Sequence, residues 1–86
     1  MAGIKIGEVT HFYNHIGVAV IELSGDLKVG DLIHILGRST DFRQEVKSMQ
    51  IEHQAISEAH AGQEIAMKVD RRVRPRDKVF RISDEE

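Results

Sequence analysis

The sequence predicts an all-β fold, a small closed six-stranded β-barrel that fills residues 1–86 as a single domain. Short runs rich in β-branched residues are separated by Gly, Asn, Asp and Ser at fairly regular spacing, a pattern that favours a sandwich or barrel over helices. No segment keeps helical apolar spacing for three turns. Breaks in the strand alternation indicate β-bulges, which bend a small sheet enough for it to close.

The first half of the chain is expected to form three strands. Residues 4–13 make the first, and the alternation slips at Gly7, which indicates a bulge. Residues 17–23, the second strand, are mostly apolar on both faces. This strand is therefore expected to be central, with the core on one side and a loop of this chain or a partner on the other. Gly30 supplies the positive φ of a type II turn before the third strand, residues 31–36.

The second half is expected to add three more strands. Residues 42–52 read as one long strand with a bulge, because their apolar positions fall out of period-2 register. Residues 55–63 tolerate a helix but contain Ala-Gly near their end, so a turn or a single helical turn is expected there. Residues 64–69 alternate cleanly, and the last strand, residues 78–82, precedes an acidic tail at residues 84–86.

Composition limits what this chain can do. A domain of 86 residues buries only about 60–65% of the surface of its unfolded chain, so the core is thin. The absence of cysteine excludes disulfides and thiolate metal sites. No apolar run is long enough to span a bilayer, and the first residues lack the apolar core of a signal peptide. A cytoplasmic location without a membrane partner is therefore expected.

Charge is distributed unevenly along the sequence, with a basic segment near the carboxyl end. Residues 68–81 hold seven basic and two acidic residues, a net charge of +5, so the rest of the chain carries −7 of the total of −2. Guanidinium groups suit phosphate contacts, and the segment is a candidate RNA-binding loop. The alternative is a solvated loop balanced by the acidic tail. The candidate residues are Arg71, Arg72, Arg74, Arg76 and Lys78.

No catalytic, nucleotide-binding or metal-binding motif is present. The sequence has no G-x-x-x-x-G-K-[ST] loop, nucleophile elbow, zincin helix or Rossmann glycine fingerprint. His11 and His15 are four residues apart, but on strands and turns this spacing does not place both on one face. The sequence therefore predicts a non-enzymatic protein with no catalytic residue, metal or cofactor, and with no nucleotide as a partner.

A set of turn motifs carries a resemblance to a known family, and it covers nearly the whole chain. The motifs are G-x-V at residues 7–9, LKVGD at 27–31, VKSMQ at 46–50, AHAGQ at 59–63 and RDKV at 76–79. In these the chain resembles the second domain of translational GTPases such as elongation factor Tu, and more closely the stand-alone translation elongation factor-like proteins. It is also similar to the C-terminal barrel of collagenase-like peptidases.

The resemblance implies particular site residues. In elongation factor Tu this domain holds the aminoacylated end of tRNA through an acidic residue before the Ala-Gly turn and an amide after it. These positions fall on Gln50 and Glu64 here, with the residue types exchanged. The family has Gly-Asp where this chain has Arg76-Asp77, so this loop is expected to avoid positive φ or to close differently.

Two functional hypotheses follow from the sequence. The first is a non-catalytic module of translation or RNA metabolism that contacts tRNA, ribosomal RNA or a ribonucleoprotein through the basic loop. The alternative is a protein-interaction module that docks on a partner protein through an outer apolar strip of the second strand. The residues assigned to that strip are Ala19, Ile21 and Leu23.

Overall fold

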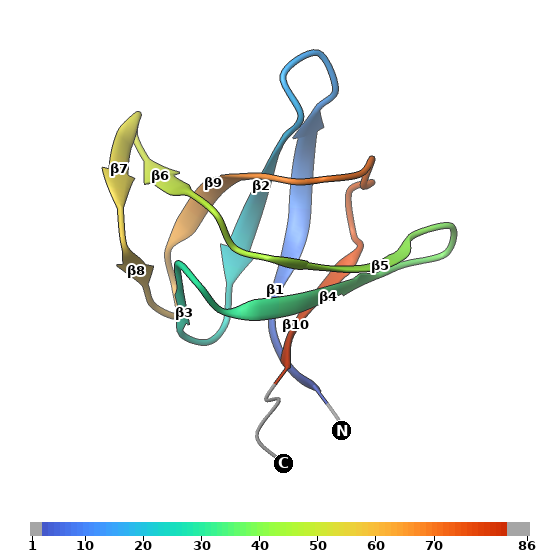
Figure 1. Cartoon of the computed structure of the whole chain (residues 1–86), viewed down its shortest axis with the longest axis horizontal. Coiled ribbons are helices and arrows are strands. Elements are labelled where there is room, and N and C mark those ends of the chain that lie inside the picture. The colour runs from blue at the N-terminus through green and yellow to red at the C-terminus, as the bar shows by residue number, and fades with distance from the viewer. Residues whose placement is uncertain (1–2, 83–86) are drawn as a thin grey trace.

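The structure is a computed structural model that describes residues 3–82. In this range the chain forms ten strands, all paired antiparallel (Figure 1). Eight form one sheet in the order β5-β4-β10-β1-β2-β9-β6-β7, and β3 pairs with β8 separately. No helix among the described residues could cross a membrane. The strands are β1 (Gly3–Tyr13), β2 (Val18–Leu23), β3 (Leu27–Lys28), β4 (Leu32–Leu36), β5 (Asp41–Glu45), β6 (Met49–Ile51), β7 (Gln54–Ile56), β8 (Glu58–Ala59), β9 (Glu64–Lys68) and β10 (Lys78–Ile82).

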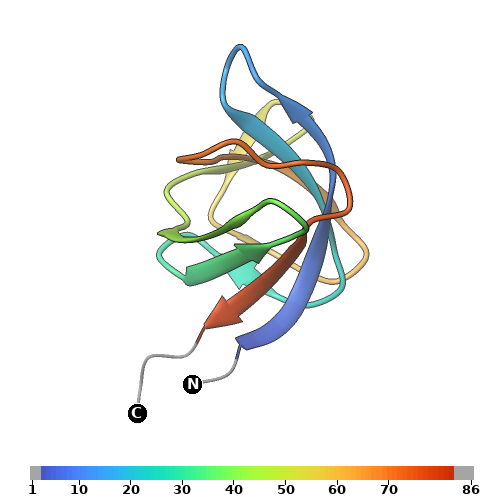
Figure 2. The same ribbon diagram turned by 90° about the vertical axis from the view of Figure 1, so that its right-hand side faces the viewer.

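The large sheet curls around an aliphatic core (Figure 2). In most strands alternate residues point inward, as the period of two requires, and apart from Gln44 the buried strand side chains are Ile, Val, Leu, Met and Ala. Burying each larger side chain contributes about 1.5–3 kcal/mol to folding, which makes this cluster the main source of stability. The largest fully buried side chains are Ile6, Ile21, Leu27, Ile33, Ile35, Met49, Ile65 and Met67.

Five of the six expected strands match β1, β2, β4, β9 and β10 to within one residue at each end. The expected bulge near Gly7 is also confirmed, because the pairing of β1 with β10 shifts between Lys5 and Gly7. A second shift, in the pairing of β1 with β2, lies between Val9 and His11. Gly30 has a φ of 99°, as the type II turn before β4 requires.

Two expectations for the middle of the chain are wrong. Residues 42–52 form two strands, β5 and β6, because the chain leaves the sheet at the fully buried Val46. The N–H of Val46 donates to the Asp31 carbonyl oxygen and its C=O accepts from the Gly30 N–H, both at 2.9 Å. The expected turn at residues 55–63 instead contains β7 and β8, which pair with β6 and β3.

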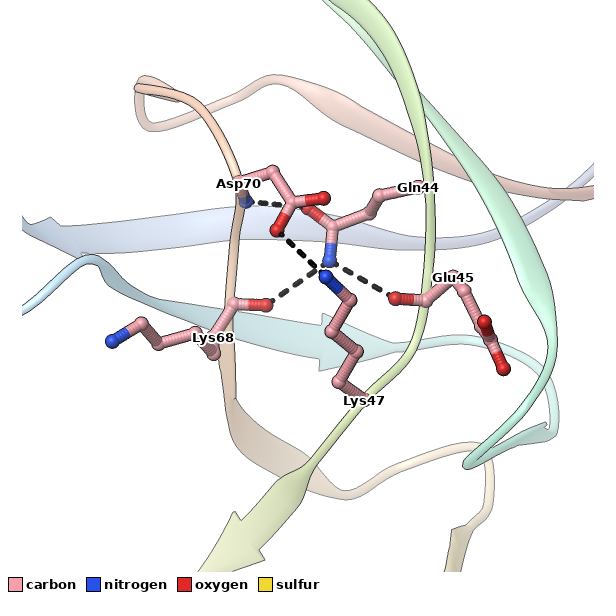
Figure 3. A network of polar contacts seen from close by, with 5 residues as sticks. All are labelled: Gln44, Glu45, Lys47, Lys68 and Asp70. Carbon is pink, nitrogen blue, oxygen red and sulfur yellow. Dashed lines mark hydrogen bonds and ion pairs between the residues drawn. The ribbon is translucent and has the colours of Figure 1, made fainter.

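The expected closed six-stranded barrel is also not found. The edge strands of the large sheet, β5 and β7, do not pair with each other. The chain around β5 and the end of β9 face each other across an open seam of the sheet, and the side chains of Gln44 and Lys47 bridge it (Figure 3). The Gln44 amide nitrogen donates to the carbonyl oxygens of Lys68 at 3.1 Å and Glu45 at 3.3 Å, and its oxygen accepts from the Asp70 N–H at 2.7 Å. Beside it, Lys47 Nζ lies 3.5 Å from Asp70 Oδ1.

The loop between β9 and β10 is held by two buried residues. Val73 is 1% and Asp77 4% exposed, and the Arg74 N–H donates to Asp77 Oδ2 at 2.9 Å. The Asp77 N–H donates to the Arg74 carbonyl oxygen at 3.1 Å, which makes a turn with Pro75 in its second position. Arg76 occupies the third position with a φ of 80°. Of the two alternatives expected for this loop, the avoidance of positive φ is therefore wrong.

Replacing Arg76 by glycine should stabilise the protein. A side chain at positive φ costs about 1–2 kcal/mol, and glycine removes this cost while increasing the entropy of the unfolded chain. We expect Arg76→Gly to raise the free energy of unfolding by about 0.5–1 kcal/mol, measured by urea denaturation. Arg74→Gly, at a position without positive φ, is the matched control and should not stabilise. Equal responses of the two variants would contradict the turn assignment.

Candidate functional site

The side chains of the basic loop are exposed, although the loop itself is held to the core by the buried Val73 and Asp77. Arg71, Arg72, Arg74 and Arg76 are all exposed, whereas Lys78 is half-buried and its Nζ donates to the Arg76 carbonyl oxygen at 3.3 Å. Within residues 3–82 none of the four arginines forms an ion pair. The acidic tail expected to balance them, residues 84–86, lies outside the described residues. The structure therefore places the four arginines on the surface of the loop between β9 and β10, with Lys78 as the first residue of β10.

The residues assigned to an outer strip of β2 do not lie on its outer face. Ala19, Ile21 and Leu23 are 0%, 0% and 3% exposed and belong to the core. The prediction that a partner protein docks on these side chains is therefore wrong, since a partner could not reach them. The outward residues of β2 are Val18 and Val20, both half-buried, followed by an exposed glutamate. The observation of two apolar faces was correct, but the docking residues were assigned to the inner one.

A groove of about 660 Å³ lies on the outer face of β2, β9 and β6. Val20 pairs with Ala66, which in turn pairs with Gln50, so these side chains form one row across its floor. The groove is walled by residues of two turns, that between β1 and β2 and that between β6 and β7. Both turns project beyond the sheet in Figure 1. The first contributes Tyr13 and Ile16, which are 49% and 59% exposed.

One end of the groove carries an anchored carboxylate. Glu64 pairs across the strands with Glu22 and lines the groove. Thr10 stands at the second bulge of β1, and its hydroxyl lies 3.2 Å from Glu64 Oε2 and 3.2 Å from the Val20 carbonyl oxygen. Bulges redirect side chains, and this one brings a hydroxyl across β2 to the carboxylate. The Glu64 side chain is thereby oriented beside the apolar floor.

Glu64 is one of three glutamates that form a row across β9, β2 and β1. Glu22 is directly opposite Glu64 on β9 and directly opposite Glu8 on β1. Like charges directly opposite each other destabilise a sheet. Lys5 Nζ lies 4.0 Å from Glu8 Oε1, at the far end of this row from the groove. The end of the groove at Glu64 therefore has a negative potential.

The other acidic residue of the groove sits in a strained turn. Glu52 and His53 connect β6 to β7 and have φ values of 52° and 67°. Two consecutive positive φ angles define a type I′ hairpin turn, which favours Asn-Gly because side chains are strained there. Both side chains nevertheless line the groove. Gln50 and Glu64, the positions implied by the resemblance to elongation factor Tu, line the same groove.

Two histidines form close pairs with carboxylates elsewhere. His34 Nε2 lies 2.6 Å from Asp41 Oδ1 across the β4–β5 hairpin, and His60 Nδ1 lies 3.1 Å from Asp26 Oδ1. Among the described residues no serine or threonine hydroxyl hydrogen-bonds to either imidazole. The same residues contain no group of three or more His, Asp or Glu side chains that could hold a metal ion. Each pair links two chain segments, and neither assembles a nucleophile with a base.

Comparisons with known proteins point to peptidases. The chain is 43% identical over 82 residues to an uncharacterized protease of Methanocaldococcus jannaschii and 36% identical over 85 residues to a collagenase of Porphyromonas gingivalis. These matches cover 94% and 96% of this chain but only 20% of each relative, so the chain spans about a fifth of their length. No family model matches the chain.

A solved structure gives the same fold. The C-terminal domain of a putative U32 peptidase from Geobacillus thermoleovorans superposes with a TM-score of 0.87, covering 94% of this chain and 93% of that one at 20% identity. The expectations of a relative of the translation elongation factors and of a role in translation or RNA binding are therefore wrong. The similarity to the barrel of collagenase-like peptidases is confirmed. The chain is related to one domain-sized segment of these proteases and has the fold of a U32 peptidase C-terminal domain.

Proposed function

We propose that this chain is a non-catalytic accessory domain of a U32-type peptidase. The observation that carries the proposal is the extent of the sequence match, which covers almost all of this chain and a fifth of each protease. The remaining four fifths of those proteases are large enough to contain a separate catalytic domain. Within residues 3–82 no serine or threonine hydroxyl bonds to either histidine–aspartate pair, which fits an accessory role.

A domain exchange tests this role. In the Porphyromonas gingivalis collagenase, the segment that matches this chain would be deleted in one variant and replaced by this chain in another. We expect the deletion to lower gelatin hydrolysis and the replacement to restore most of it. The isolated chain should not hydrolyse gelatin, because the catalytic groups lie elsewhere. Circular dichroism of both variants would confirm that they are folded.

Two results would overturn the proposal. One is gelatin hydrolysis by the isolated chain after purification to homogeneity. The other is a folded replacement variant that is no more active than the deletion variant, since it would show that the two segments are not equivalent in function.

A further inference from the structure

We propose that the groove on the outer face of β2, β9 and β6 binds a short extended peptide in which an apolar side chain stands next to a lysine or arginine. This inference rests on the proposed function, because a protease acts on polypeptides. The groove has a volume of about 660 Å³, which lies within the range of about 300–1,000 Å³ of small-ligand sites. Its position on three paired strands makes its floor rigid.

The apolar part of the ligand is specified by the floor and one wall. Val18, Val20 and Ala66 are half-buried and form a shallow apolar surface. Tyr13 and Ile16 rise beside it and are largely exposed, although both are large and apolar. An aliphatic side chain placed on this surface would remove apolar area from water on both partners.

The charge of the ligand is specified by the carboxylates. The described residues that line the groove include Glu52 and Glu64 but no lysine or arginine. Glu64 is adjacent to the row formed with Glu22 and Glu8, so the negative potential extends beyond the groove. A cationic side chain at this end would relieve the repulsion between the opposed carboxylates.

Two features indicate that the acidic side chains are arranged before a ligand arrives. The single proton of the Thr10 hydroxyl is shared between Glu64 Oε2 and the Val20 carbonyl oxygen, and when it points to Oε2 it orients the carboxylate, so less side-chain entropy is lost when a ligand binds there. Glu52 and His53 occupy positive φ angles in a turn that favours glycine. Strain of this kind is concentrated at ligand-binding and active sites.

The proposal is tested by titrating the isotope-labelled chain with three acetylated, amidated pentapeptides while recording amide NMR spectra. The first carries a leucine next to a lysine, the second replaces the lysine by glutamate, and the third replaces the leucine by glycine. We expect the first peptide to shift the amide signals of β2, β6 and β9 around Val20 and Ala66, and to bind most tightly. Binding should weaken as salt is added, because the charges are exposed.

Two matched variants test whether the charge of Glu64 contributes to peptide binding. Glu64→Gln keeps the size of the side chain but removes the charge, and we expect it to weaken binding of the lysine peptide by about two- to fivefold. Glu45→Gln, on β5 away from the groove, should leave binding unchanged. Unchanged signals outside the groove would show that both variants remain folded.

Three results would overturn the groove assignment. They are equal binding of the lysine and glutamate peptides, an unchanged affinity in Glu64→Gln, and the absence of groove shifts at millimolar peptide. If the domain exchange restores hydrolysis while the peptide titration fails, the accessory role stands and the groove assignment falls. If the titration succeeds while the exchange fails, the accessory role alone falls.

Discussion

Gly37→Ala is expected to lower the free energy of unfolding by about 3 kcal/mol, because a methyl group at this position has no space. A Cβ atom on Gly37 would overlap Oδ1 of the buried Asp77 and lie 2.5 Å from its Cγ. Asp77 cannot move away freely, since its carboxylate accepts the Arg74 N–H and its backbone oxygen accepts the Val9 N–H at 2.8 Å. The measurement is the free energy of unfolding in urea.

A double-mutant cycle identifies the cause of this loss. Asp77→Ala removes all three atoms nearest to the added methyl group, so Gly37→Ala should cost much less in that background. We expect a coupling free energy of about 1 kcal/mol or more. Ser39→Ala, an exposed substitution in the same hairpin turn, is the control and should change stability by less than about 0.5 kcal/mol. Additive effects of the two substitutions would contradict the overlap.

Gln44→Ala is expected to destabilise the protein by about 2–3 kcal/mol. The substitution leaves the Asp70 N–H and the Lys68 carbonyl oxygen without their partner at a position where Gln44 is only 5% exposed. An unsatisfied buried polar group costs about 1–3 kcal/mol, and the two losses are partly offset when water enters. Urea denaturation of the variant gives the change in the free energy of unfolding.

Two further variants show whether the seam depends on the amide of Gln44. Gln44→Glu keeps the size and can still accept the Asp70 N–H, but it cannot donate to the Lys68 carbonyl oxygen. It should therefore also destabilise. Gln50→Ala removes an exposed glutamine from β6 and should be nearly neutral. A loss in Gln50→Ala as large as that in Gln44→Ala would exclude a specific role of the seam.

The parts of the fold that the sequence predicted are those with one buried face. β9 alternates between buried and exposed residues, so its period and its bounds could be read directly. β7 has exposed Gln54 and Ala55 and no such alternation, and its existence depends on pairing with β6. The seam could not be predicted for a similar reason, because Gln44 has no local pattern that distinguishes it from a surface glutamine.

The candidate site was predicted only in part, and the function incorrectly. Val18 and Val20 were visible as apolar residues on the second face of β2. The contact of Thr10 with Glu64 depends on a bulge, and the position of the Glu52-His53 turn beside the groove depends on a hairpin, and only the fold reveals either one. The motifs that carried the resemblance to translation factors are mostly turn residues. Such residues determine how a chain bends around a small core and carry little information about what its surface binds.

The Gln44 bridge also determines how the molecule can move. Across the rest of the large sheet, separating two strands breaks a ladder of backbone hydrogen bonds, which is a cooperative and expensive event. At the seam, rotation of the Gln44 side chain releases two hydrogen bonds that cross it, to Lys68 and Asp70, and only the exposed Lys47–Asp70 ion pair is left to break. Transient opening of the core to solvent should therefore begin between β5 and the end of β9, well below the free energy of global unfolding.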